Sequence, residues 1–310
     1  MLKYWIMMIR IADIIKTVVV AVMLTAVMTV TGEAAVASRG ELALPTVPDS
    51  LRAPAERADY ILLHFWDAME WGDSAVVRDG AWMEQTFVNF ASLIPYASSA
   101  AALDSAFTTL FDRAQTDMEA YRLLLGLADR YLYEPESPMH DEEAYMRVLD
   151  AVIADNCLDP VLLTRYTYQL DEAKRNRQGS AAADFPLTLM SGEQSTLYDV
   201  ASGADETLVM FYDAECDHCI EVIEMLSASP ELKSRVDSGQ LKVLAVYFEG
   251  DETMLSEVRR LIPGWWMSAY TPGNPVEEQE LYSIRRLPTL YLISRDGIVK
   301  KKDFNPETLL

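Results

Sequence analysis

The chain has 310 residues, which at about 150 residues per domain predicts about two domains, each large enough to bury a core. Half of the residues are hydrophobic and 24% are charged, a mixture that excludes a chain disordered throughout. The net charge of −22 argues against a nucleic-acid partner, because phosphate-backbone binding needs clustered Lys and Arg.

The first 37 residues are predicted to be a signal peptide (residues 1–37). A segment carrying Lys3, Arg10 and Lys16 precedes an uninterrupted apolar run, and small residues ending at Ala37 follow it. This order is typical of a cleavable secretory signal. The alternative is a retained N-terminal anchor, although the apolar run of about 15 residues is shorter than the ~20 that a membrane span needs. We therefore expect a periplasmic or cell-envelope protein.

Two stretches with different periodicity follow. Residues 38–54 contain three prolines and are predicted to be a linker. Residues 55–178 are predicted to form an all-α helical domain of five or six amphipathic helices, because apolar residues recur at helical spacing. The first of these stripes consists of Leu62, Phe65, Trp66 and Met69.

A hinge is predicted at residues 176–183, where Gly, Ser and Ala are frequent. Beyond it, residues 183–310 alternate strand-like and helical patterns, which predicts an α/β domain with an antiparallel edge. The expected strands are Phe185–Met190, Thr196–Val200, Thr207–Tyr212, Leu241–Phe248, Thr289–Ile293 and Ile298–Lys301, and the expected helices are Cys219–Ser227 and Met254–Ile262.

The most informative motif is Cys216-Asp217-His218-Cys219, which joins an apolar strand to an amphipathic helix. A cysteine at a helix N-terminus is favoured as a thiolate by the free N–H groups and by the helix dipole. A second cysteine one turn later can attack the mixed disulfide and release the substrate. The motif therefore predicts Cys216 as the nucleophile and Cys219 as the resolving thiol.

This strand–Cys-x-x-Cys–helix unit, together with Leu287-Pro288-Thr289 before a strand, resembles the thioredoxin superfamily. The spacing between the motifs and the preceding hairpin resemble its TlpA/ResA-like thiol-disulfide reductase branch. The resemblance implies a cis peptide bond at Pro288, and it implies that Leu287, Pro288 and Thr289 position the substrate backbone beside the dithiol. The helical half, through its segment Leu63–Asp67, resembles a helical domain of unknown function that is fused to thioredoxin-like domains in Gram-negative envelope proteins.

Charges around the cysteines are expected to tune the direction of the redox reaction. Asp213, Glu215 and Asp217 disfavour a thiolate at Cys216, whereas a protonated His218 favours it. Three carboxylates against one histidine favour a reductase of protein disulfides. No metal or bound cofactor is expected, so electrons must come from a redox partner.

Other interpretations of the motif are less favoured. Zinc needs about four ligands, and the sequence holds no second pair at zinc-binding spacing. A structural disulfide in so short a loop would constrain little of the unfolded chain. The alternative function is an envelope protein-binding module in which the helical domain holds a partner and the thioredoxin-like domain is mainly structural. The run Lys300–Lys302 is interpreted as protection of an outer strand edge.

Overall fold

The structure is a computed structural model that describes residues 40–248 and 255–310. The predicted signal peptide therefore lies outside the described residues. Within the described ranges, none of the helices combines the length and the apolar character that a membrane crossing requires.

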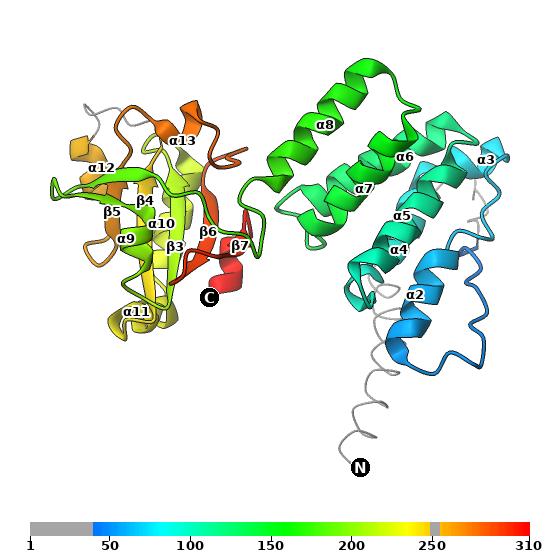
Figure 1. Cartoon of the computed structure of the whole chain (residues 1–310), viewed down its shortest axis with the longest axis horizontal. Helices are drawn as coiled ribbons and strands as arrows, with labels where there is room; N and C mark the ends of the chain where they lie inside the picture. The colour runs from blue at the N-terminus through cyan, green and yellow to red at the C-terminus, as the bar shows by residue number, and fades with distance from the viewer. Residues whose placement is uncertain (1–39, 249–254) are drawn as a thin grey trace, which may run out of the picture. The chain divides into compact units, whose positions relative to one another are not determined.

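The first part of the described chain is helical, as predicted (Figure 1). Aspartate side chains cap five of its helices by accepting hydrogen bonds from the first free backbone N–H groups, which explains where these helices begin. The α-helices are α2 (Pro54–His64), α3 (Ser74–Val77), α4 (Gly80–Ala91), α5 (Ala100–Ala114), α6 (Met118–Ala128), α7 (Glu142–Asp155) and α8 (Pro160–Lys174), with a 3₁₀ turn η1 (Ile94–Tyr96) and a π-helical turn η2 (Asp129–Tyr133).

These helices share one hydrophobic core. Phe87, Phe107 and Leu124 have no exposed surface. The stripe that begins at Leu62 is buried, but its helical spacing is not realised, because α2 ends at His64 and Phe65, Trp66 and Met69 follow it outside the helix. The structure has more α-helices between residues 54 and 174 than the five or six expected, because α3 is a single turn that is too short to give a periodic signal.

The second part is a mixed seven-stranded sheet in the order β2-β1-β5-β4-β3-β6-β7. Parallel β3 and β4 lie at its centre, and antiparallel β6 and β7 lie on one side, which confirms the predicted thioredoxin-like α/β class. The strands are β1 (Pro186–Leu189), β2 (Gln194–Thr196), β3 (Glu206–Tyr212), β4 (Leu241–Tyr247), β5 (Met267–Tyr270), β6 (Thr289–Ser294) and β7 (Val299–Lys302).

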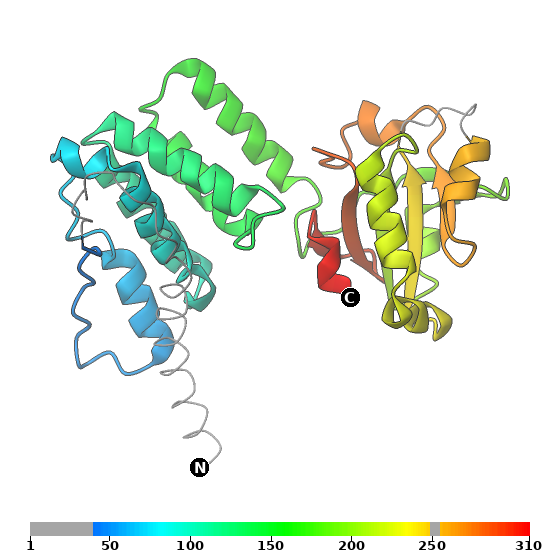
Figure 2. The same ribbon diagram turned by 180° about the vertical axis from the view of Figure 1, so that it is seen from behind.

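Helices cover both faces of this sheet, so alternate residues of β3 enter different cores. Leu208 and Met210 pack with residues of α10 (Asp217–Ser227), α11 (Pro230–Asp237) and α12 (Leu255–Leu261). Val209 and Phe211 pack on the opposite face with residues of α9 (Leu197–Ala201) and α13 (Pro275–Glu278) (Figures 1 and 2). Burial on both faces explains the continuous apolar sequence of β3. The described chain ends in a 3₁₀ turn, η4 (Pro306–Leu309).

Two local predictions differ from the structure. The expected strand Thr196–Val200 is wrong: only Thr196 is in β2, and its hydroxyl accepts a hydrogen bond from Asp199 N, 3.2 Å, which caps α9. The expected edge role of Lys302 is also wrong, because this residue is only 8% exposed. Strand β5 and helix α11 were not predicted, since each is short and β5 lacks an alternating pattern.

The segment predicted as a hinge is hydrogen-bonded to the sheet edge. Gly179 N donates to Val299 O at 2.8 Å, and Ala182 N donates to Gly297 O at the same distance. Ala181 also forms an isolated antiparallel bridge with Ile298. Backbone groups of the connection thus satisfy part of the outer edge of β7, where free N–H and C=O groups would otherwise face water.

Candidate active site

The end of β3 and the start of α10 place the two cysteines. Cys216 is the N-cap of α10, and its Sγ accepts a hydrogen bond from the backbone N–H of Cys219 at 3.2 Å. This sulfur therefore occupies the position where a helix N-terminus favours negative charge. Cys216, the nucleophile expected from the sequence, is thus the cysteine placed at the helix end.

The two thiols differ in access to solvent. Both are free; Cys216 is partly exposed, and Cys219 is completely buried. Burial raises the pKa of Cys219 well above its usual value, and the neighbouring Cys216 adds to this effect. Cys216 is therefore partly open to solvent, whereas Cys219 is held in the interior as a protonated thiol.

The start of β6 brings a third predicted element to the cysteines. Strands β3 and β6 pair with Phe211 opposite Thr289, so the loop before β6 lies beside the loop after β3. The Cys216 thiol lies 3.6 Å from the carbonyl oxygen of Leu287 and donates to it. The Leu287–Pro288 peptide bond is cis, as the resemblance implied.

Thr289 belongs to this loop but faces inward. It has no exposed surface, and its hydroxyl donates a hydrogen bond to the carbonyl oxygen of Arg286. Its side chain therefore stabilises the turn before β6 and is unavailable to a substrate. Of the three residues predicted to position substrate, Leu287 and Pro288 are the ones placed beside the dithiol.

The charged residues around the cysteines make local contacts. The Asp213 carboxylate accepts a hydrogen bond from Glu215 N at 2.6 Å, which stabilises the turn into the motif. His218 is 57% exposed, and its ring nitrogen lies 3.5 Å from a carboxylate oxygen of Glu221. Asp217 begins α10 and is exposed. The structure thus brings Glu215, Asp217 and His218 to the mouth of the site.

A groove of about 300 Å³ adjoins this motif. Its lining consists of α10 residues, including His218 and Glu221, of Arg286, of residues 305–307, and of Pro135 and Glu136 of the helical part. Sequence analysis did not identify Arg286, Pro135 or Glu136, because nothing local marks a contact between residues about 150 positions apart.

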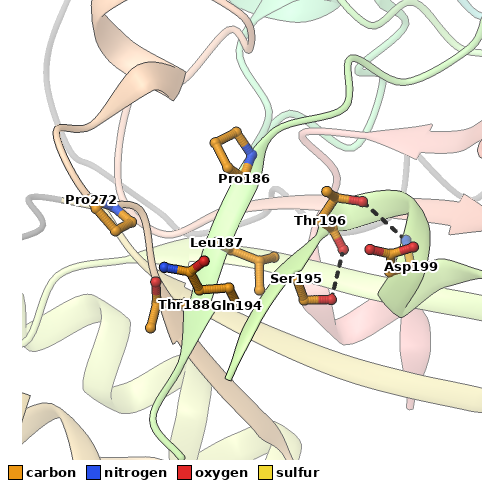
Figure 3. A pocket seen from close by; sticks show the side chains of 8 residues that line it. All are labelled: Pro186, Leu187, Thr188, Gln194, Ser195, Thr196, Asp199 and Pro272. Carbon is orange, nitrogen blue, oxygen red and sulfur yellow. Dashed lines mark hydrogen bonds between the residues drawn. The ribbon is translucent and has the colours of Figure 1, made fainter. Parts of the chain in front are cut away.

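A second pocket, of about 390 Å³, lies at the other edge of the sheet. It is lined by residues of β1 and β2, by Asp199 and by Pro272 (Figure 3). None of the predicted site residues lines it. No group of three or more His, Cys, Asp or Glu among the described residues is arranged to hold a metal ion.

Comparison with known families identifies the helical part. Residues 22–176 match the family described as "Domain of unknown function (DUF5106)". The chain belongs to the DUF5106 family. Its DUF5106 domain precedes a thioredoxin-like domain, and no curated protein matches the chain.

A solved structure extends this similarity over both parts of the DUF5106 protein. It is a thioredoxin-like protein from Bacteroides caccae, with 29% identity, a TM-score of 0.77, and coverage of 88% of this chain and 97% of that one. The C-terminal domain of an uncharacterized protein from Bacteroides fragilis is 32% identical, with a TM-score of 0.42, over 44% of this chain and 95% of that one. The thioredoxin domain of a thiol-disulfide oxidoreductase from Bacteroides vulgatus is 20% identical, with a TM-score of 0.37, over 43% of this chain and 91% of that one.

Proposed function

We propose that the protein is an extracytoplasmic thiol-disulfide oxidoreductase that reduces protein disulfides through Cys216 and Cys219. One observation carries the proposal: an accessible cysteine sulfur caps a helix, a buried thiol lies one turn behind it, and the carbonyl of Leu287 lies beside it. This arrangement supplies a nucleophile, a resolving group and a backbone acceptor in one place.

In the forward reaction, the Cys216 thiolate attacks one sulfur of a substrate disulfide. A mixed disulfide forms, and the other substrate sulfur leaves as a thiolate that takes up a proton. Cys219 then loses its proton and attacks the Cys216 sulfur, which releases the second substrate thiol. The substrate gains two electrons and two protons, the protein becomes a Cys216–Cys219 disulfide, and a dithiol redox partner must reduce it again.

The neighbouring residues have supporting roles in this proposal. Leu287 and Pro288 form the surface against which the substrate backbone lies, and Thr289 holds that loop from within. Glu215 and Asp217 place negative charge near the nucleophile, and His218 places a titratable group there, so these residues set the balance between reducing and oxidising activity.

The location in the periplasm or cell envelope rests on the N-terminal sequence pattern. A positively charged segment, an apolar run and small residues up to Ala37 are typical of a cleaved secretory signal. Protein disulfides persist in such compartments, so the proposed substrates occur where the protein would be delivered.

A redox titration tests the function. The chain from Ser38 is equilibrated in dithiothreitol buffers, free thiols are alkylated, and the Cys216–Cys219 state is read by mass. A midpoint near −270 mV, about the thioredoxin value, supports a reductase, whereas one near −120 mV, about the value of a strong oxidant, reverses the direction. If Cys216 and Cys219 do not convert reversibly between dithiol and disulfide, the oxidoreductase function is excluded. The alternative function is then favoured, in which the helical domain binds an envelope partner.

A further inference from the structure

Arg285 connects the helical domain to the loop that carries Pro288. Its guanidinium carbon lies 3.7 Å from the centre of the Tyr133 ring, and the group donates hydrogen bonds to Tyr133 O at 3.2 Å and to Asp303 at 2.9 Å. On its other side Tyr133 stacks on Tyr145, with ring centroids 4.4 Å apart and an interplanar angle of 18°. The guanidinium is therefore fixed by a planar contact, a carbonyl and a carboxylate at once.

The turn that provides these contacts has an uncommon backbone. Tyr133 is the last residue of η2, a π-helical turn, and π-helical turns are rare and frequent at functional sites. Three residues further on, the Glu136 carboxylate accepts a hydrogen bond from Arg286 at 2.7 Å. Two consecutive arginines before Leu287 are thus held by one short segment, Tyr133–Glu136.

The same segment borders the groove beside the dithiol. Glu136 and Arg286 line it together with His218, which lies between the two cysteines in sequence. Arg286 is also next to Leu287, whose carbonyl is 3.6 Å from the Cys216 sulfur. The cysteines themselves do not line the groove, but residues adjacent in sequence to Cys219 and to Leu287 do, so the groove is a hollow next to the dithiol into which the chain flanking a bound disulfide can extend.

We infer that the DUF5106 domain contributes directly to the dithiol site. Its Tyr133–Glu136 turn positions the loop Arg285–Pro288. The same turn forms one wall of a groove that holds the polypeptide flanking the substrate disulfide. The inference rests on the proposed function and deepens it, because it assigns to the helical domain a surface that holds the polypeptide on either side of the substrate disulfide. Tyr133 and Arg285 are positioning residues, and Glu136 and Arg286 are residues of the groove wall.

The test is a charge reversal at the groove. Glu136 is 75% exposed, so Glu136→Arg is compatible with folding, yet it replaces the 2.7 Å ion pair with Arg286 at the groove wall by two adjacent guanidinium groups. The probe for a protein disulfide is insulin. We expect its KM to rise roughly three- to tenfold, with little change in kcat. Turnover of a small disulfide, oxidised glutathione, should be unchanged, and adding Arg286→Glu should restore the KM for insulin.

A matched control separates this effect from the change in net charge. Glu119→Arg breaks another exposed ion pair of the helical domain, Glu119–Arg78 at 2.7 Å, and does not touch the groove. The inference is overturned if the two variants have the same KM for insulin, or if oxidised glutathione is affected as strongly as insulin. If the unsubstituted protein reduces neither probe, the proposed function fails together with the inference; if it reduces both and the charge reversal has no effect, only the inference fails.

Discussion

Lys302 on β7 donates a hydrogen bond of 2.9 Å to Glu142, the first residue of α7. The same ammonium group donates to the carbonyl oxygens of Glu172 at 3.3 Å and Ala173 at 2.8 Å, near the end of α8. The Lys302 side chain is only 3% exposed. A lysine of the sheet is therefore buried among groups of the helical domain, and its charge is compensated there by one carboxylate and two carbonyl oxygens.

Removing this lysine should destabilise the protein strongly. Lys302→Ala leaves Glu142 buried without its cation, and breaking a buried ion pair costs about 3–5 kcal/mol. Lys302→Met combined with Glu142→Gln removes both charges and should cost clearly less. The measurement is the free energy of unfolding in urea, with Lys300→Ala as the control at an exposed position of the same strand. Equal losses for the single and the double variant would contradict a paired buried charge.

The two active-site thiols should differ in reactivity toward iodoacetamide. In the native reduced protein we expect alkylation at Cys216 and protection of Cys219, because Cys219 is fully buried and burial raises its pKa. Peptide mass analysis after a short treatment, with and without urea, measures both sites. Modification of Cys219 before Cys216 in the native protein would reverse the assignment of nucleophile and resolving thiol.

Substitution of the resolving thiol should stop the reaction at its intermediate. Cys219→Ser leaves Cys216 able to attack but removes the group that releases the substrate, so a mixed disulfide with the protein substrate should accumulate. Non-reducing gels followed by mass analysis detect it. The matched variant Cys216→Ser should form no such adduct and should lose insulin reduction; an adduct in that variant would show that another thiol attacks.

Acidification should weaken the fold through His140. Burial lowers the pKa of His140 below its ordinary value of 6.5, and its Nδ1 has no hydrogen-bond partner among the residues that the structure describes. Between the lowered pKa and 6.5, the unfolded chain binds more protons than the folded one, so stability falls as the pH falls through this window. The free energy of unfolding should therefore decrease less between pH 7 and pH 5 in His140→Gln than in the unsubstituted protein.

Above pH 7 both states of His140 are neutral, so the same two proteins should show parallel stability curves there. This range is the internal control for any general effect of the substitution. Parallel curves below pH 6.5 as well would contradict a lowered pKa for His140 in the folded state.

The sequence allowed prediction of features that depend on local pattern. The apolar strand before Cys216, the helix after it and the burial of the Leu62 stripe all follow from residues that are neighbours in the chain. Contacts across the fold carry no such signal. The burial of Lys302 depends on Glu142, 160 positions earlier, so a run of three lysines was interpreted as an exposed edge. The stacking of Arg285 on Tyr133 was missed for the same reason.

The pairing of β3 with β6 has a consequence for how tolerant the protein is to change. Phe211 is opposite Thr289, and this alignment alone brings two loops that are 71 residues apart to within contact distance at Cys216 and Leu287. A slip of one residue would turn every side chain of β6 to the opposite face and move its loop away from the sulfur. Insertions or deletions inside β3 or β6 should therefore abolish disulfide reduction even where the chain still folds. Changes in the length of the turn between β6 and β7 should leave the pairing of β3 with β6 intact.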